Sequence, residues 1–200
     1  MSTGVVILAA GESSRMGRPK QLLAYRDSTL LHHAIETAFS LPTAPVIVLG
    51  AHAEEIRAHL TDHRVIIVEN PNWREGMGGS LRLGLEALQG AHPEITSAIF
   101  LLCDQPLISP SVLADLIATH ERTAAPIVAS EYDGVLGVPA LFAQSLFPEL
   151  LALDGPSGAR HLIHAHAEQT AALPFQEGAI DIDTPDDYAR LQAPAAGRAE

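Results

Sequence analysis

Short, continuous apolar runs recur along the first two thirds of the chain, and segments with a helical pattern separate them. The runs are residues 5–10, 46–49, 65–68, 98–102 and 127–129. A run of this kind, rich in β-branched residues, is typical of a strand buried on both faces of a parallel sheet. Helices are expected at residues 29–40, 53–60, 80–88 and 111–122. The alternation predicts an α/β fold: a three-layer α/β/α sandwich around a Rossmann-like, mostly parallel sheet.

The pattern is less regular after residue 130. Residues 131–136 are expected to form an irregular strand and turn, 139–146 and 156–166 helices, and 171–175 and 180–182 short strands. Thr184 as a cap and Pro185 at the first helical position predict a final helix. We expect residues 1–192 to form a single domain. Residues 193–200, rich in alanine, proline and glycine, are expected to be a flexible tail.

Composition and charge exclude several classes of protein. The chain is 47% hydrophobic and 18% charged, which is typical of a globular domain. Its net charge of −12 argues against a general nucleic-acid or membrane-surface binder, and no apolar stretch approaches the ~18 residues of a membrane span. The single cysteine, Cys103, excludes an internal disulfide and a cysteine-based zinc cluster. A cytoplasmic location is therefore expected.

The loop at residues 11–20, directly after the first expected strand, has the composition of a phosphate-binding loop. Ligands of open α/β sheets bind beyond the carboxyl ends of the strands. Gly11 is expected to permit a tight turn whose N–H groups face an anion. The polar residues that follow are Ser13, Ser14, Arg15, Arg18 and Lys20, the last being the only lysine of the chain. The loop is neither a Walker A nor a Gly-x-Gly-x-x-Gly motif, so a polyphosphate loop of another kind is predicted.

Three aspartates are candidate magnesium ligands. Asp104 directly follows the apolar run 98–102, where it could also cap the next turn. Mg²⁺ takes one or two carboxylates together with phosphate oxygens, and a bound triphosphate needs its charge neutralised. Asp181 and Asp183 are two residues apart, which places them on one face of the short strand expected there. Either can supply the second carboxylate.

A second glycine-rich segment, residues 76–80, precedes the helix expected from Ser80. Glycine lets backbone approach a flat ligand, and Ser80 adds a hydroxyl, although Ser80 could equally be a simple helix cap. The only tryptophan, Trp73, is either a core residue or a wall of the ligand site. The ten histidines do not show the spacing of a metal site, and His52 alone follows a strand at the expected ligand edge.

The sequence Leu-Ala-Ala-Gly-Glu-Ser-Ser-Arg-Met-Gly-Arg-Pro-Lys at residues 8–20 resembles the signature of the MobA-like nucleotidyltransferases. Within that group it is most similar to the molybdenum cofactor cytidylyltransferases. Residues 69–85, 103–107, 137–142, 155–160 and 181–188 resemble further motifs of the family in the same order. The segment before Arg160 departs from the pattern, because Gly155-Pro156-Ser157 replaces the acidic position of that motif.

The resemblance implies an enzyme that moves CMP from CTP to the phosphate of molybdopterin and releases pyrophosphate. It implies phosphate contacts from Arg15 and Lys20, and Mg²⁺ held by Asp104 with Asp183 or Asp181, of which we favour Asp183. The nucleotide-binding residues it implies are Leu8, Ala9, Ala10, Gly11, Ser13, Gly79 and Ser80. The expected partners are CTP, the molybdenum cofactor and a molybdenum hydroxylase that receives the cofactor.

Three other functions stay open. The first is a guanylyltransferase of the same group. The motifs of that branch resemble Leu-Ala-Gly-Gly and Asp-Met-Pro, whereas this chain has Leu8-Ala9-Ala10-Gly11 and Asp104-Gln105-Pro106 at the corresponding positions. Some similar proteins are NADPH-dependent reductases of a nicotine-derived pigment. A carrier that binds the cofactor without catalysis is the third alternative, and the presence of Arg15, Lys20 and Asp104 argues against it.

Overall fold

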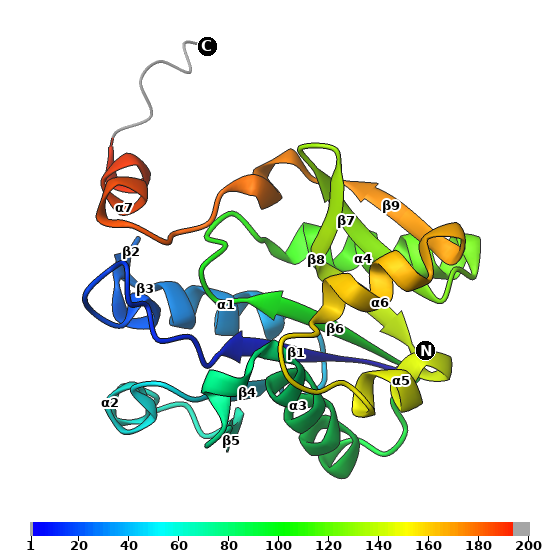
Figure 1. Ribbon diagram of the computed structural model, residues 1–200, viewed down its shortest axis with the longest axis horizontal. Helices are drawn as coiled ribbons and strands as arrows, with labels where there is room; N and C mark the ends of the chain where they lie inside the picture. The colour runs from blue at the N-terminus through cyan, green and yellow to red at the C-terminus, as the bar shows by residue number, and fades with distance from the viewer. Residues whose placement is uncertain (1, 194–200) are drawn as a thin grey trace.

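The computed structural model describes residues 2–193, which form three layers around a central seven-stranded sheet (Figure 1). The strands are β1 (Thr3–Ala9), β4 (Val46–Leu49), β5 (Ile66–Glu69), β6 (Ser97–Leu102), β7 (Ile127–Tyr132), β8 (Val135–Ala143) and β9 (Thr170–Pro174). Their order is β5-β4-β1-β6-β8-β7-β9, and only β8 runs antiparallel to its neighbours. The predicted α/β/α sandwich with a mostly parallel sheet is confirmed. Outside the sheet, β2 (Ala24–Tyr25) pairs with β3 (Ser28–Thr29).

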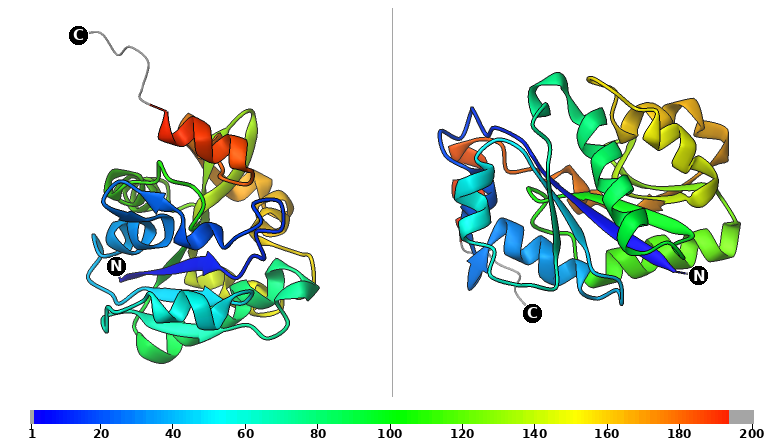
Figure 2. Two further views of the ribbon diagram at one scale, coloured as in Figure 1. Left: turned by 90° about the vertical axis from the view of Figure 1, so that its left-hand side faces the viewer. Right: turned by 90° about the horizontal axis from the view of Figure 1, so that it is seen from below.

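Helices cover both faces of the sheet, as the two further views in Figure 2 show. They are α1 (Leu30–Ala38), α2 (Ala53–Ala58), α3 (Met77–Ala91), α4 (Pro110–Thr123), α5 (Phe147–Leu151), α6 (Ala159–Ala165) and α7 (Pro185–Gln192). Short 3-10 turns are η1 (Lys20–Leu22), η2 (Trp73–Glu75), η3 (Gln144–Leu146), η4 (Ala167–Gln169) and η5 (Gln176–Ala179). None of the helices within residues 2–193 is long and apolar enough to cross a membrane.

The alternation of side chains along β1 divides the core into two clusters. Val5 and Ile7 pack with α1, α2 and α4, whereas Val6 and Leu8 pack with α3, α5 and α6. Both faces of β1 are therefore buried, which explains why its sequence is a continuous apolar run instead of an alternating one. Helix α3 lies very close to the sheet, because a Cβ on Gly84 would come within 2.4 Å of Val6 Cγ1.

The helix predicted at residues 139–146 is wrong, because β8 continues through this segment to Ala143. Proline is rarely found inside a strand with neighbours on both sides. Pro139 is tolerated here because the register between β7 and β8 shifts at Ala129/Ser130, where the ladder passes from Ala140 to Gly137. The Ser130 hydroxyl donates to the Pro139 carbonyl at 2.7 Å inside this bulge. A short apolar run alone does not distinguish a strand from a helix.

The strand predicted at residues 180–182 is also wrong, whereas the final helix is confirmed. Residues 180–183 follow η5 without regular structure, and the Ile182 N–H donates to the Asp104 carbonyl at 3.0 Å. Thr184 caps α7 in a capping box with Asp187. The expected helix at 156–166 is shorter and begins at Ala159. The predicted tail from residue 194 onward lies outside the described residues.

Candidate active site

A cavity of about 260 Å³ opens at the carboxyl ends of β1 and β6, which are neighbours in the sheet. This is the edge at which open α/β sheets bind ligands. Its lining consists of Leu8, Ala9, Ala10, Gly11, Lys20, Gln21, Trp73, Gly76, Met77, Ser80, Leu102, Cys103 and Asp104. Five of the seven residues predicted to bind nucleotide are in this lining, and Ser13 and Gly79 are not.

Burial raises the pKa of the Cys103 thiol, which argues against a nucleophilic role.

Gln21, which the sequence analysis missed, holds the loop after β1 in place. Its side-chain amide donates to the carbonyls of Ala9 at 2.8 Å and Gly11 at 3.0 Å. The Ser13 hydroxyl donates to Gln21 Oε1 at 3.4 Å and accepts from the Lys20 N–H at 3.1 Å. The predicted tight turn at Gly11 is wrong, because the positive φ values belong to Ser13 and Gly17. A Cβ on Gly11 would enter open space instead.

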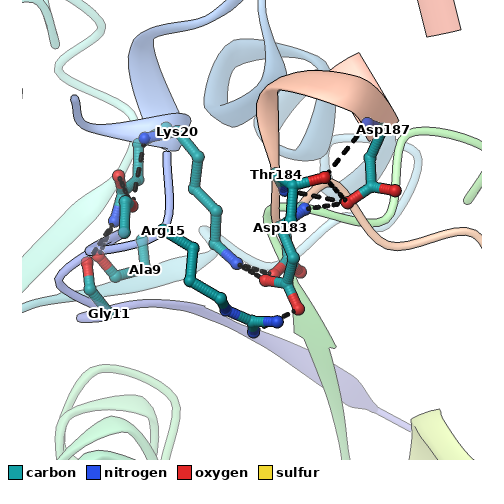
Figure 3. Close-up of polar contacts among 10 residues, drawn as sticks. Ala9, Gly11, Arg15, Lys20, Asp183, Thr184 and Asp187 are labelled. Atoms are coloured by element: carbon teal, nitrogen blue, oxygen red, sulfur yellow. Dashed lines mark hydrogen bonds and ion pairs between the residues drawn. The ribbon is translucent and has the colours of Figure 1, made fainter. Parts of the chain in front are cut away.

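A charged centre lies at the rim of the cavity and joins three segments of the chain (Figure 3). The Lys20 ammonium donates to Asp104 Oδ2 and, at 2.8 Å, to Asp183 Oδ1. Arg15 donates to the other oxygen of Asp183 at 2.7 Å. The side chains of Lys20 and Asp104 are only 13% and 12% exposed, whereas that of Arg15 is 68% exposed. Two predicted cations and two predicted metal ligands thus come together.

The three aspartates of the site have different environments. Hydrogen bonds from Lys20 and the charges of Lys20 and Arg15 lower the pKa of Asp183. Burial, with the negative charges of Asp104 and Asp183, raises the pKa of Asp181 to about 6. Burial alone would lower the pKa of Lys20, but Asp104 and Asp183 outweigh it and raise that pKa. Proximity to these two carboxylates therefore keeps the lysine charged, whereas at Asp181 burial and the neighbouring negative charges favour the protonated form.

The carboxylates fit a divalent cation that also binds phosphate. The second oxygen of Asp104, Oδ1, is buried and has no hydrogen-bond partner among residues 2–193, and a buried carboxylate oxygen calls for a cation or a donor. Within the described residues, no group of three or more histidine, cysteine, aspartate or glutamate side chains is placed to hold a metal on its own. Two carboxylates supplemented by phosphate oxygens are the usual arrangement for Mg²⁺.

The glycines at the start of α3 are required by the chain itself. A Cβ on Gly76 would lie 2.2 Å from the Gly155 carbonyl oxygen, and one on Gly78 would lie 2.7 Å from that of Asp154. These glycines are therefore required for close packing against the loop before α6. Gly76 also lines the cavity, so the predicted approach of this backbone to a flat ligand stays a prediction. Ser80 lies inside α3, so it is not the helix cap, and its Oγ accepts from the buried Asn70 side chain at 3.0 Å.

Trp73 and His52 complete the surroundings of the cavity. Trp73 is half-buried and lines the cavity, with the Arg74 guanidinium 4.2 Å from its ring centroid, so it is a wall residue and not a core residue. A Cβ on Gly50 would lie 2.7 Å from Trp73 Cβ and 2.8 Å from Ala10 Cβ, which shows that these residues pack closely together. A ring nitrogen of His52 lies 3.2 Å from the Glu12 carbonyl oxygen, outside the cavity.

Comparison with known proteins identifies relatives that cover most of the chain. Residues 5–170 match the MobA-like NTP transferase domain family. The nicotine blue oxidoreductase of Paenarthrobacter nicotinovorans is 35% identical over 78% of each chain. The molybdenum cofactor cytidylyltransferase of Escherichia coli is 23% identical over 92% of each. The bifunctional protein GlmU of Thermobifida fusca is 35% identical over 58% of this chain, but the match spans only 25% of GlmU.

Solved structures of similar fold cover nearly the whole chain. The crystal structure of Rv0371c from Mycobacterium tuberculosis superposes with a TM-score of 0.83 and 34% identity over 96% of this chain and 97% of that one. A complex of the same protein with manganese gives a TM-score of 0.78 and 32% identity over 96% and 98%. A divalent metal is therefore bound by a protein with this fold and a third of its residues in common.

Proposed function

The chain belongs to the MobA-like NTP transferase family, and we propose that it transfers CMP from CTP to the phosphate of the molybdenum cofactor, releasing pyrophosphate. The observation that carries the proposal is the charged centre, in which Lys20 lies between Asp104 and Asp183 beside a cavity. Such an arrangement suits a reaction between phosphate groups, because negative charge must be held and neutralised at one point. The cytidylyltransferase branch is supported by the match with the Escherichia coli enzyme.

The roles of the residues follow from what phosphoryl chemistry needs. In this displacement the protein mainly positions the reactants and balances charge. Lys20, which is nearly buried, and Arg15, which reaches in from solvent, would hold the phosphates and orient the α-phosphorus toward the attacking oxygen. Asp104 and Asp183, with Asp181 as the alternative, would hold Mg²⁺, which neutralises phosphate charge when bound. The cavity walls exclude water around the base.

The packing of one cavity wall supports a pyrimidine base. The cavity volume of about 260 Å³ lies just below the roughly 300 to 1,000 Å³ of most small-molecule sites, so the choice of base depends on the shape of its walls. Ala10, Trp73 and Gly50 pack against one another at one wall, so there is little room there for a larger ring. Ser80, which lines the cavity, would face the base edge, and the resemblance at residues 8–11 favours CTP over GTP.

The test is competition between nucleotides in the presence of the molybdenum cofactor. Purified protein is supplied with CTP and GTP at equal concentration, and pyrophosphate and the nucleotide attached to the cofactor are measured. Preferential attachment of CMP is expected. Equal use of GTP, or preference for it, would reject the cytidylyl assignment and favour a guanylyltransferase. Absence of pyrophosphate with any nucleoside triphosphate would reject nucleotidyl transfer altogether and favour a carrier.

A second candidate function is an NADPH-dependent reduction of a nicotine-derived pigment. The observation in its favour is the 35% identity with the nicotine blue oxidoreductase, a higher figure than the 23% with the cytidylyltransferase. The loop after β1 does not have the Gly-x-Gly-x-x-Gly sequence of many dinucleotide sites. Oxidation of NADPH that depends on the pigment, measured from its absorbance, would establish this function, whereas no oxidation is expected here.

Three further parts of the proposal concern the chain as a whole. We propose that residues 1–192 act as one catalytic domain, because residues from Arg15 to Asp183 meet in one site. We place the protein in the cytoplasm, where its buried Cys103 stays reduced. The product would be passed to a molybdenum hydroxylase, and co-purification of the loaded protein with such an enzyme is the measurement that checks it.

A further inference from the structure

The side chain of Gln21 is a polar group that the sequence did not identify and the reaction does not use directly. Gln21 is fully buried, yet it lies against the cavity. Glutamine is mostly exposed in proteins, and a buried amide is stable only when its hydrogen bonds are made. Its amide nitrogen bonds to Ala9 and Gly11, and its oxygen accepts from Ser13. Gln21 therefore contacts the loop at three points.

These bonds fix the direction of two peptide groups of the loop. In a trans peptide the C=O of one residue and the N–H of the next point to opposite sides. Because the carbonyls of Ala9 and Gly11 both point at the Gln21 amide, the N–H groups of Ala10 and Glu12 both point away from it. Gly11, between them, lines the cavity and has open space where a Cβ would be.

We propose that Gln21 is a positioning residue for the nucleoside triphosphate: it turns the peptide groups after Ala9 and Gly11 so that the N–H groups of Ala10 and Glu12 bind phosphate oxygens. The inference rests on the proposed function, since it assumes that a triphosphate binds at this loop. Aligned backbone N–H groups form a concave anion site without a charged side chain, and their effect is largest when their direction is fixed before the ligand arrives. Gln21 supplies that fixed direction.

The test separates binding of the phosphates from binding of the base. Dissociation constants for CTP and for cytidine are measured by equilibrium dialysis, without metal, for the wild type and for Gln21→Met, which has a similar shape but no amide. We expect Gln21→Met to weaken CTP binding about tenfold or more, because the loop N–H groups would lose hydrogen bonds to the charged triphosphate. Cytidine has no phosphate, so its binding should change less than about twofold. Gln192→Met is the matched control, because Gln192 also donates to a carbonyl, that of Ala24, but lies outside the cavity lining.

A second variant gives a readout that loss of packing would not produce. Gln21→Glu has the shape of glutamine, but its ionised carboxylate cannot donate to the two carbonyls. Burial raises the pKa of such a carboxyl group, and the protonated form regains one O–H donor. The CTP affinity of Gln21→Glu, relative to wild type at the same pH, should therefore recover as the pH falls from about 8 to 5, while that of Gln21→Met should stay low throughout.

The outcomes separate this inference from the proposed function. If the wild type binds CTP neither in the metal-free assay nor after Mg²⁺ is added, the proposed function fails. If the wild type binds CTP but Gln21→Met binds it equally well, or loses cytidine and CTP binding to the same degree, the positioning role is overturned and the proposed function stands. The positioning role is also overturned if the CTP affinity of Gln21→Glu, relative to that of the wild type at the same pH, does not change between about pH 8 and 5.

Discussion

The two segments that meet in the charged centre are held in place by different means. Residues 11–20, which carry Arg15 and Lys20, are fixed by hydrogen bonds to the buried amide of Gln21. Residues 180–183, which carry Asp183, are fixed mainly by Ile182. Its side chain is fully buried with Met16, Leu23, Tyr25 and Leu30, and its N–H donates to the Asp104 carbonyl at 3.0 Å. The cationic segment thus depends on a polar anchor and the acidic segment on an apolar one.

The difference shows how a site can be assembled from irregular backbone. Neither segment is a strand, so neither gains its position from sheet hydrogen bonds. The acidic segment is also fastened at its far end, since the Asp183 N–H donates to Asp187 Oδ2, which is part of the cap of α7. Met16 packs against Ile182, so the two segments support each other. Substitutions in each segment can separate their contributions.

The largest effect is expected where the two segments are joined, at Lys20. Replacing Lys20 with methionine keeps an unbranched stem but removes the one charge that contacts both Asp104 and Asp183. The loss of one fixed charge contact at such a site costs on the order of 10²–10³ in rate. We therefore expect kcat/KM for nucleotidyl transfer to fall by that factor. A value near that of the wild type would contradict the role of Lys20.

Metal binding provides a control for the same substitution. Without Lys20, nearly buried Asp104 loses its cationic partner, and breaking a buried ion pair costs about 3–5 kcal/mol. The melting temperature of Lys20→Met should be lower than that of the wild type. Mn²⁺ should raise the melting temperature of the variant by more than it raises that of the wild type, because in the variant the metal does not compete with an ammonium group for the carboxylates. Equal stabilisation of both proteins by Mn²⁺ would show that Lys20 and the metal do not share this position.

The next largest effect distinguishes the two aspartates of the acidic segment. Asp183 bonds to both Lys20 and Arg15, whereas Asp181 bonds to neither in the described part of the chain. Asp183→Asn should reduce metal-dependent kcat/KM on the order of 10²-fold, and Asp181→Asn should reduce it clearly less. Activity measured against Mg²⁺ concentration for both variants and Asp104→Asn checks the order. A larger loss for Asp181→Asn would assign the second metal ligand to Asp181.

The cationic side of the site could be predicted from sequence better than the acidic side. Lys20 and Asp104 lie in the segments that follow the apolar runs 5–10 and 98–102, and adjacent parallel strands bring their carboxyl ends to one edge, so the fold class predicts that both segments lie at that edge. The position of Asp183 depends on Ile182, whose tertiary contacts a local pattern does not contain. The strand expected at residues 180–182 has the right composition, but no strand in the described part of the chain pairs with this segment.

Three other features were hidden for physical reasons. The helix predicted at 139–146 failed because a bulge lets Pro139 lie inside β8, and a bulge leaves no mark in an apolar run. Gln21 was missed because nothing in a sequence distinguishes a buried glutamine from an exposed one. The packing that requires Gly76 and Gly78 could not be predicted, because the loop that they contact lies seventy-odd residues later and cannot be placed by local pattern.

A smaller effect is expected from weakening the apolar anchor of the acidic segment. Ile182→Ala removes buried methyl groups and should lower the free energy of unfolding by about 2–4 kcal/mol, measured by chemical denaturation. Because Asp183 would then be held less firmly, the KM for Mg²⁺ should rise while Lys20 still binds nucleotide. Leu116→Ala, at a buried leucine of α4 in the cluster that contains Val5 and Ile7, is the matched control, since it should destabilise the fold similarly and leave that KM unchanged. An equal rise in both variants would contradict a local role for Ile182.

The smallest effect is expected at Arg15, the exposed arm of the cationic segment. Its side chain is 68% exposed and, among the carboxylates of the described residues, contacts only Asp183, at 2.7 Å, so Arg15→Ala should change the free energy of unfolding by less than about 1 kcal/mol. A charge-assisted hydrogen bond to a phosphate is nonetheless worth about 1.5 kcal/mol or more, so kcat/KM should fall about tenfold. Because an exposed charge is screened by salt, the ratio of wild-type to variant kcat/KM should shrink as ionic strength rises, whereas that for Lys20→Met, whose side chain is nearly buried, should hardly change. The measurement is kcat/KM of both variants at low and high salt. If Arg15→Ala loses as much kcat/KM as Lys20→Met, and the loss is equally insensitive to salt, the guanidinium is buried against the triphosphate during the reaction.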